Sequence, residues 1–139
     1  MTEPLHTLPL PNGQCLHGDE SAGALHLQLD LHEPIHLRLS PGEPLQVTAT
    51  EALSEQSVWL ACYWLFARDD SCQTLRWSLP AVPLAALRSG VLVVDAEGGV
   101  TAERTAFWQL PTPWLQGEQG GPYPQQMVIS DGKRHPRRP

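Results

Sequence analysis

The residues best suited to chemistry lie close together, at His26, His32, Glu33 and His36. Imidazole nitrogens and a carboxylate are ligands that divalent transition metals accept, and such a set can leave a coordination position open. In the hairpin pairing expected below, His26 lies near the far end, so only His32, Glu33 and His36 converge. These three are the candidate ligands of a divalent metal. The simpler interpretation is a solvent-facing polar side of a hairpin, which requires no cofactor.

Nucleophilic catalysis has little support in the sequence. A nucleophilic thiol needs an oriented histidine, and Cys62 lies in an apolar stretch where thiols are usually inert. Cys15 is close to His17, but their neighbourhood in an irregular segment does not fix a geometry. No Gly-x-Ser-x-Gly elbow and no phosphate-binding loop is present. Enzymatic activity is therefore left open, and a protein that is not an enzyme is favoured.

The three cysteines also bear on the compartment. They form no metal-binding spacing, and no secretory signal follows Met1, so we expect reduced thiols in a cytoplasmic protein. A hairpin could bring one pair together, Cys62 with Cys72.

Tryptophan is abundant for a chain of 139 residues, with five in all. One core cannot easily bury five indoles and satisfy every N–H group, and Trp and Arg are enriched at the centres of protein interfaces. We therefore expect a non-enzymatic module that binds a protein partner, or itself as a homodimer, through a neutral aromatic face. The competing interpretation places Trp59, Trp77 and Trp108 in the core. The candidate interface residues are Trp64, Phe66, Arg76, Trp108 and Trp114.

Charge is unevenly distributed. Residues 1–132 contain all 15 acids and five arginines, a formal charge of −10, whereas the last seven residues contain four basic ones. An acidic body repels phosphate backbones, so we expect no nucleic-acid partner. An adaptor that masks a basic protein is a further, weaker hypothesis. No apolar run approaches the roughly 20 residues of a membrane-spanning helix, so no membrane partner is expected.

Two stretches alternate strictly between apolar and polar residues, as half-buried strands do. They run over residues 24–31 and 35–39, and a three-residue loop at 32–34 keeps their apolar residues on one face. This register places Leu29 opposite Leu37, Asp30 opposite His36 and His26 opposite Ser40. The result is a hairpin with one wet face.

The stretch Ser57–Arg68 has no charge, Gly or Pro between Val58 and Ala67. Its β-branched and aromatic residues favour a strand, because they lose side-chain freedom in a helix and leave it no polar face. A helix over about 51–67 is the alternative. As a strand, it pairs with residues 72–79, which sets Trp64 beside Arg76 in a cation–π contact.

The remaining segments are short. We expect strands at 45–49, 91–95 and 100–110, one helical turn at 83–88, and an edge strand at 127–129. The fold class is then all-β, an antiparallel β-sandwich or small barrel of about 7–8 short strands with one short helical turn. The alternative is α+β with the helix at about 51–67. The expected organisation is an irregular arm or edge strand at 1–22, a single β domain at 23–115, and an extended or disordered tail at 116–139, basic at its end.

Overall fold

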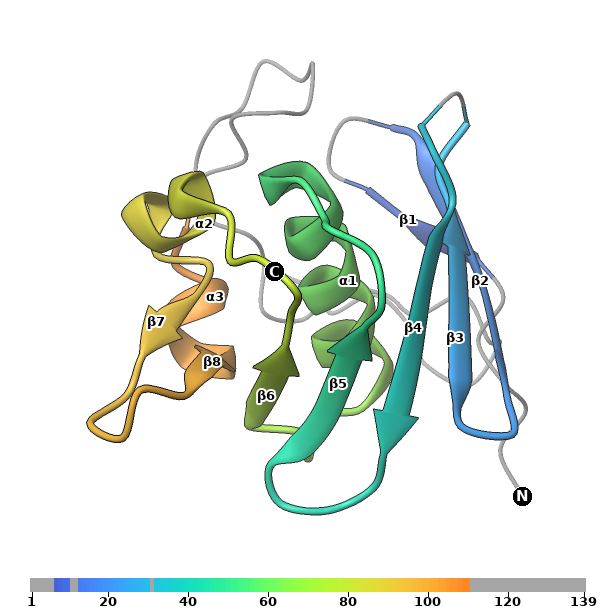
Figure 1. The fold of residues 1–139 in the computed structure, drawn as a ribbon. Coiled ribbons are helices and arrows are strands. Elements are labelled where there is room, and N and C mark those ends of the chain that lie inside the picture. The colour runs from blue at the N-terminus through green and yellow to red at the C-terminus, as the bar shows by residue number, and fades with distance from the viewer. Residues whose placement is uncertain (1–6, 11–12, 31, 111–139) are drawn as a thin grey trace, which may run out of the picture.

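The computed structural model describes residues 7–10, 13–30 and 32–110, which form one mixed sheet of eight strands with three helices (Figure 1). The strand order is β1-β2-β3-β4-β5-β6-β8-β7, and neighbours are antiparallel except β5 and β6. The elements are β1 (Thr7–Pro9), β2 (Cys15–Ser21), β3 (Ala24–Gln28), β4 (Ile35–Ser40), β5 (Leu45–Ala49), α1 (Glu55–Arg68), β6 (Thr74–Ser78), α2 (Leu84–Ser89), β7 (Val93–Val94), β8 (Val100–Glu103) and α3 (Arg104–Phe107).

The described residues are thus a β-rich α+β fold. The expected sandwich or barrel is corrected, because the sheet does not close on itself and helices cover it where a second sheet was expected. A single long helix accounts for the difference. Its buried surface meets the apolar side of the sheet, so no second sheet is needed to complete the core.

The helix α1 replaces the strand favoured for Ser57–Arg68. Ser54 caps its first turn, since the Ser54 Oγ accepts a hydrogen bond of 3.1 Å from the Ser57 N–H, and Arg68 lies in the last turn. Every residue from Ser57 to Ala67 is buried. A helix that is apolar all round is buried on all sides. The missing polar face therefore indicated a fully buried helix and was no argument for a strand. The alternative with a helix at about 51–67 is correct in type.

Strand β6 follows α1 and lies parallel to β5, so β5, α1 and β6 form a crossover unit. Leu75 pairs with Leu45 on one side and Ala102 on the other, and Arg76 pairs with Gln46 and Thr101. The expected hairpin between residues 57–68 and 72–79 is therefore wrong. So is the proposed Trp64–Arg76 contact, because Arg76 alternates with the buried Leu75 and Trp77 and points to the opposite face of the sheet.

The hairpin of β3 and β4 has the expected faces and a different register. Leu25 lies opposite Leu37 and His26 opposite His36, so the pairings of Asp30 with His36 and His26 with Ser40 are corrected. The strands stop earlier because Gln28 closes a longer loop. Its side-chain amide donates to the Asp30 and His32 carbonyls, at 3.2 and 2.6 Å.

The remaining expectations concern the segments before β3 and after β6, and their outcomes differ. The arm expected at 1–22 contributes β1, which is an edge strand, and β2. The helical turn is confirmed as α2, ended by Gly90 at φ 90°. The strand expected at 100–110 stops at Glu103 and continues as α3. The strand at 127–129 and the tail at 116–139 lie outside the described residues.

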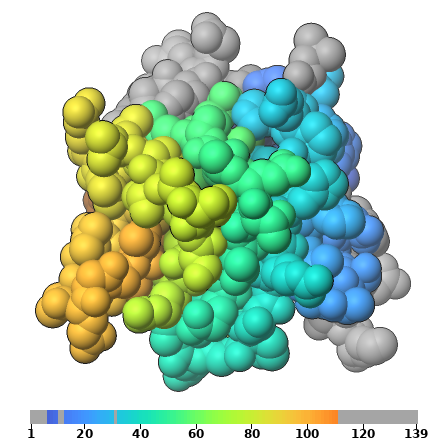
Figure 2. Space-filling view, viewed as in Figure 1, coloured from blue at the N-terminus to red at the C-terminus, as the bar shows by residue number. Residues whose placement is uncertain are grey.

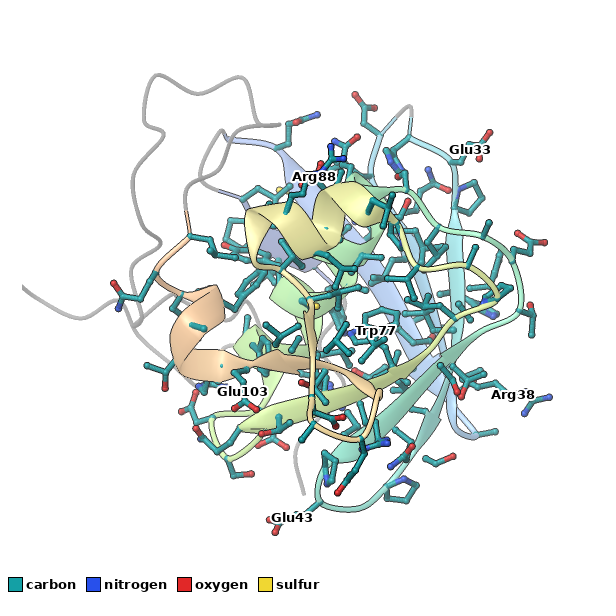
Figure 3. The ribbon with its side chains drawn as sticks, turned by 60° about the vertical axis from the view of Figure 1, so that its left-hand side comes forward. Glu33, Arg38, Glu43, Trp77, Arg88 and Glu103 are labelled. Carbon is teal, nitrogen blue, oxygen red and sulfur yellow. The ribbon has the colours of Figure 1, made fainter. Side chains whose placement is uncertain are left out.

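Within the described residues, one face of the sheet forms the core, and most strand residues on the other face are exposed. The leucines of β3 and β4 and Val47, Leu75 and Trp77 point to the buried side, and Figure 3 shows Trp77 in the interior and Arg38 pointing outward. In Figure 1 β5 and β6 lie in front of α1, so Figure 2 views the face away from the helix. We call this the open face; its residues include His17, Asp19, His26, His36, Arg38, Gln46 and Arg76. No helix among the described residues is long and apolar enough to cross a membrane.

Candidate functional site

The aromatic residues proposed as an interface lie mostly in the core. Trp64 and Phe66 are fully buried on α1, and Trp108 is 3% exposed. Burial of Trp108 agrees with the interpretation that competed with an interface. While the fold is intact, these three side chains form no surface for a partner. Trp114 lies outside the described residues.

The aromatic cluster joins α1 to α3 and the residue after it. Trp59 stacks on Tyr63 with ring centroids 5.1 Å apart, and Phe66 lies 5.6 Å from Phe107. Phe107 also meets Trp108 edge to face at 5.3 Å. Such aromatic pairs add roughly 0.5–1.5 kcal/mol each beyond the area they bury. The cluster is therefore explained by packing.

Arg104, which opens α3, holds the carboxyl end of α1. Its Nη1 donates to the carbonyl oxygens of Phe66, Asp69 and Cys72, at 2.8, 2.9 and 3.0 Å. These carbonyls belong to the last turn of α1 and the loop beyond it, where backbone acceptors lack helical partners. Burial lowers the pKa of the Arg104 guanidinium. The residue is thus structural, and no feature of its local sequence identified it.

Trp64 is held by β2, not by Arg76. Its indole Nε1 donates to Glu20 Oε2 at 3.0 Å, and the same carboxylate oxygen lies 3.0 Å from Arg68 Nε. The backbone of β2 approaches the ring closely at Gly18, where an added Cβ would lie 2.5 Å from the indole. A small residue on β2 therefore lets α1 pack against the sheet. Arg76 instead forms an ion pair of 3.5 Å with Asp95.

The candidate metal ligands do not gather at one point. His32 Nδ1 contacts the backbone oxygen of Glu33 at 2.9 Å, whereas His36 meets His26 across the strands with ring centroids 4.6 Å apart. Figure 3 shows Glu33 pointing away from the body of the protein. Within residues 7–10, 13–30 and 32–110, no group of three or more His, Cys, Asp or Glu side chains is placed to hold a metal ion.

The three thiols are all free, and Cys62 and Cys72 form no disulfide. Burial raises the pKa of the Cys62 thiol, against a smaller lowering effect of its contact with Trp77. Burial also raises the pKa of Cys72. Cys15 is exposed, and the neighbouring His17 lies 3.5 Å from the Thr7 hydroxyl. High thiol pKa values leave little thiolate, so Cys62 and Cys72 are poor nucleophiles.

An apolar patch lies instead at the end of the sheet. Among the described residues, the large apolar side chains that remain exposed are Leu84, Val93 and Val94, at 63, 46 and 54%. They come from α2 and β7, which adjoin each other in Figure 1, and we call them the edge patch. Val91 and Leu92, just before β7, are buried. A strand was expected at 91–95; the structure has one at Val93–Val94, and the exposure of both valines was not predicted.

A hollow of about 580 Å³ lies where β5 and β6 begin, between the loop before β5 and the loop after α1. Its lining combines acidic, basic and neutral groups without a dominant sign, and Glu43 projects from its rim in Figure 3. None of the residues proposed from the sequence lines it. The residues that do are Pro41, Gly42, Glu43, Pro44, Leu45, Arg68, Asp69, Ser71, Cys72, Gln73 and Thr74.

Comparison with known proteins adds no relative. No protein-family model matches the chain, and no curated protein or solved structure matches it. The geometry of the chain itself therefore carries any proposal about its function.

Proposed function

We propose that the chain is a non-enzymatic protein-binding module that self-associates through the edge patch. The observation that carries this proposal is the position of Leu84, Val93 and Val94. They are exposed and apolar; Val93 and Val94 form β7, the last strand of the sheet, and Leu84 belongs to α2, the element before β7 in the chain. Of the aromatic residues first considered for this role, those that the structure describes (Trp64, Phe66 and Trp108) are buried, so the proposal rests on β7.

The edge position supports pairing by strand addition. In the described residues β7 has one neighbour, β8, through Val93 opposite Thr101 and Val94 opposite Val100. A strand at a sheet edge presents unpaired N–H and C=O groups, and proteins that avoid association shorten it or place charges or proline there. β7 is two residues long, and both are valine. Valines on β7 have the opposite effect, since successive residues project to both faces and offer apolar contact on each.

A second copy of the chain is the occupant that we propose. In a two-fold dimer the same patch meets itself, so an apolar edge is matched by an equally apolar one. Antiparallel pairing of two β7 strands would continue the sheet across the dimer axis. The buried valines and leucines would then gain hydrophobic stabilisation of roughly 25 cal/mol for each Å² removed from water.

Light scattering at several protein concentrations tests the proposal. We expect the wild-type chain of 15.3 kDa to approach twice that mass as concentration rises. Val94→Lys should give a monomer with unchanged circular dichroism, because its side chain is exposed. Gln46→Lys is the matched control; it adds the same charge on the open face and should still dimerise.

A wild-type chain that remains monomeric at concentrations up to about 0.5 mM would refute self-association, because a dimer with a dissociation constant above that value is weaker than specific dimers usually are. Equal loss of dimer in Val94→Lys and Gln46→Lys would refute the edge patch as the contact. The variant Trp64→Asp is unsuitable for this test, because it would place a charge inside the core.

The alternative proposal, a metal or small-ligand site at His32, Glu33 and His36, has less support. His32 turns to the Glu33 backbone and His36 to His26, so the three side chains are divided between two places.

A further inference from the structure

The open face carries a pair of histidines, His26 and His36, that the register expected from the sequence did not place opposite each other. His26 on β3 lies directly opposite His36 on β4, and both side chains are exposed. Their rings meet edge to face, with centroids 4.6 Å apart and planes inclined at 78°. The pair is held by the sheet, because the backbone register of β3 and β4 fixes where both Cβ atoms stand.

The separation of the rings matches that of two imidazoles bound to one metal ion. A metal lies roughly 2.0–2.1 Å from each imidazole nitrogen, hence about 3.2 Å from each ring centre. Two such rings are about 4.5 Å apart at an angle of ~90° and about 5.2 Å apart at the tetrahedral angle. The observed 4.6 Å lies within this range. Each ring can also turn about χ2, a soft torsion, and so change the direction of its nitrogens.

The formal charges around the pair cancel, with one carboxylate and one guanidinium nearby. Asp19 on β2 lies opposite His26, so a carboxylate stands next to the pair in the same row across the sheet. Arg38 lies two residues beyond His36 on the same face and points outward in Figure 3. His17 and Gln28 form the adjacent row and are neutral when His17 is unprotonated. Water reaches the pair freely, so it can supply the remaining ligands.

We infer that His26 and His36 form a two-histidine chelating site for a divalent transition metal such as Zn²⁺ or Ni²⁺, completed by water. Imidazole is a suitable ligand for both ions. The site needs two protein ligands, so it agrees with the finding that no larger group converges in the described part of the chain. It is independent of the edge patch, which lies on another part of the sheet. It shares His36 with the set His32, Glu33 and His36 and differs from that set in its second ligand, His26.

Isothermal titration with ZnCl₂ and, separately, NiCl₂ tests this inference on untagged protein at neutral pH. All samples should carry Cys15→Ser, because the exposed thiol of Cys15 would otherwise compete for the metal. We expect one ion per chain. His26→Ala and His36→Ala should each weaken binding at least tenfold, because a single imidazole chelates nothing.

His17→Ala and His32→Ala are the matched controls, since each removes one imidazole and leaves the pair intact. Both should bind within about twofold of the parent. Circular dichroism and thermal melting of each variant show whether the fold is kept, which is expected at exposed positions. Absence of binding by the parent at 1 mM metal, roughly the weakest affinity worth measuring, would overturn the inference. Loss of binding in the controls equal to that in His26→Ala would do so too.

Discussion

At the residue scale, Arg104 is the side chain on which most backbone groups depend. Its Nη1 serves the carbonyls of Phe66, Asp69 and Cys72, and its side chain is 13% exposed. We expect Arg104→Ala to lower the free energy of unfolding by about 2–4 kcal/mol, because these three carbonyls lose their charged donor, although the Asp69 carbonyl keeps a second one, the Cys72 N–H. Urea denaturation followed by circular dichroism measures the change.

Two variants separate geometry from charge in this experiment. Arg104→Lys keeps the positive charge at the end of α1 but loses the planar guanidinium, so it should recover only part of the loss. Arg88→Ala removes an exposed arginine from the last turn of α2 and should change stability by less than about 0.5 kcal/mol. An Arg104→Ala variant as stable as Arg88→Ala would contradict the structural role given to Arg104.

The sequence indicated which residue types matter more reliably than it indicated their neighbours. The five tryptophans led to the expectation that one core could not bury them all, but the four that the structure describes are buried. The Trp64 indole has its partner in Glu20. That partner lies 44 residues earlier in the chain, on a segment expected to be irregular. Cross-sheet partners of this kind depend on topology, so local pattern favoured Arg76 and could not find Glu20.

At the element scale, the start of α1 depends on one hydroxyl. Ser54 Oγ accepts from the Ser57 N–H, in the extended conformation usual for an N-cap. We expect Ser54→Ala to lower the free energy of unfolding by about 1 kcal/mol, and Ser54→Asp to preserve it, since Asp caps equally well. The midpoint of urea denaturation reports both changes.

Thr50 provides the matched control, because it is another hydroxyl-bearing residue shortly before α1. In the structure Thr50 is exposed and precedes α1 by five residues, so Thr50→Ala should be nearly neutral. A larger loss of stability in Thr50→Ala than in Ser54→Ala would contradict a helix that begins after Ser54.

The periodicity of apolar residues identified the half-buried strands β3 and β4 but could not identify the fully buried helix α1. Leu25, Leu27, Ile35 and Leu37 alternate because β3 and β4 have one wet face, and their faces were predicted correctly. The register was not, because Gln28 binds the loop carbonyls and ends β3 early. In α1 every position from 57 to 67 is buried, so neither a period of two nor one of 3.6 remained to be detected.

At the scale of the whole molecule, the parallel pairing of β5 with β6 reorganised the expected fold. A parallel pair needs a crossover connection, and α1 supplies it. When residues 57–68 are interpreted as a strand, residues 72–79 become its antiparallel neighbour, and the expected sheet contains a hairpin that does not exist. The wet face of the β3–β4 hairpin was predicted, whereas the histidine pair was not, because it depends on the register of these two strands.

The three cysteines measure how this fold opens as a unit. Cys15 is exposed, Cys72 is partly buried, and Cys62 is fully buried in α1 at the centre of the core. We expect a thiol reagent at pH 8 to label Cys15 within the mixing time and Cys62 only through global unfolding, because α1 has no solvent-facing side in the described structure. Mass spectrometry of the labelled peptides assigns each rate.

Arg104→Ala should accelerate labelling of Cys62, about tenfold for each 1.4 kcal/mol by which the variant lowers the free energy of unfolding, and leave labelling of Cys15 unchanged. Labelling of Cys62 as fast as Cys15 in the wild-type chain would contradict the buried position of α1, and with it the single core that this fold shares between helix and sheet.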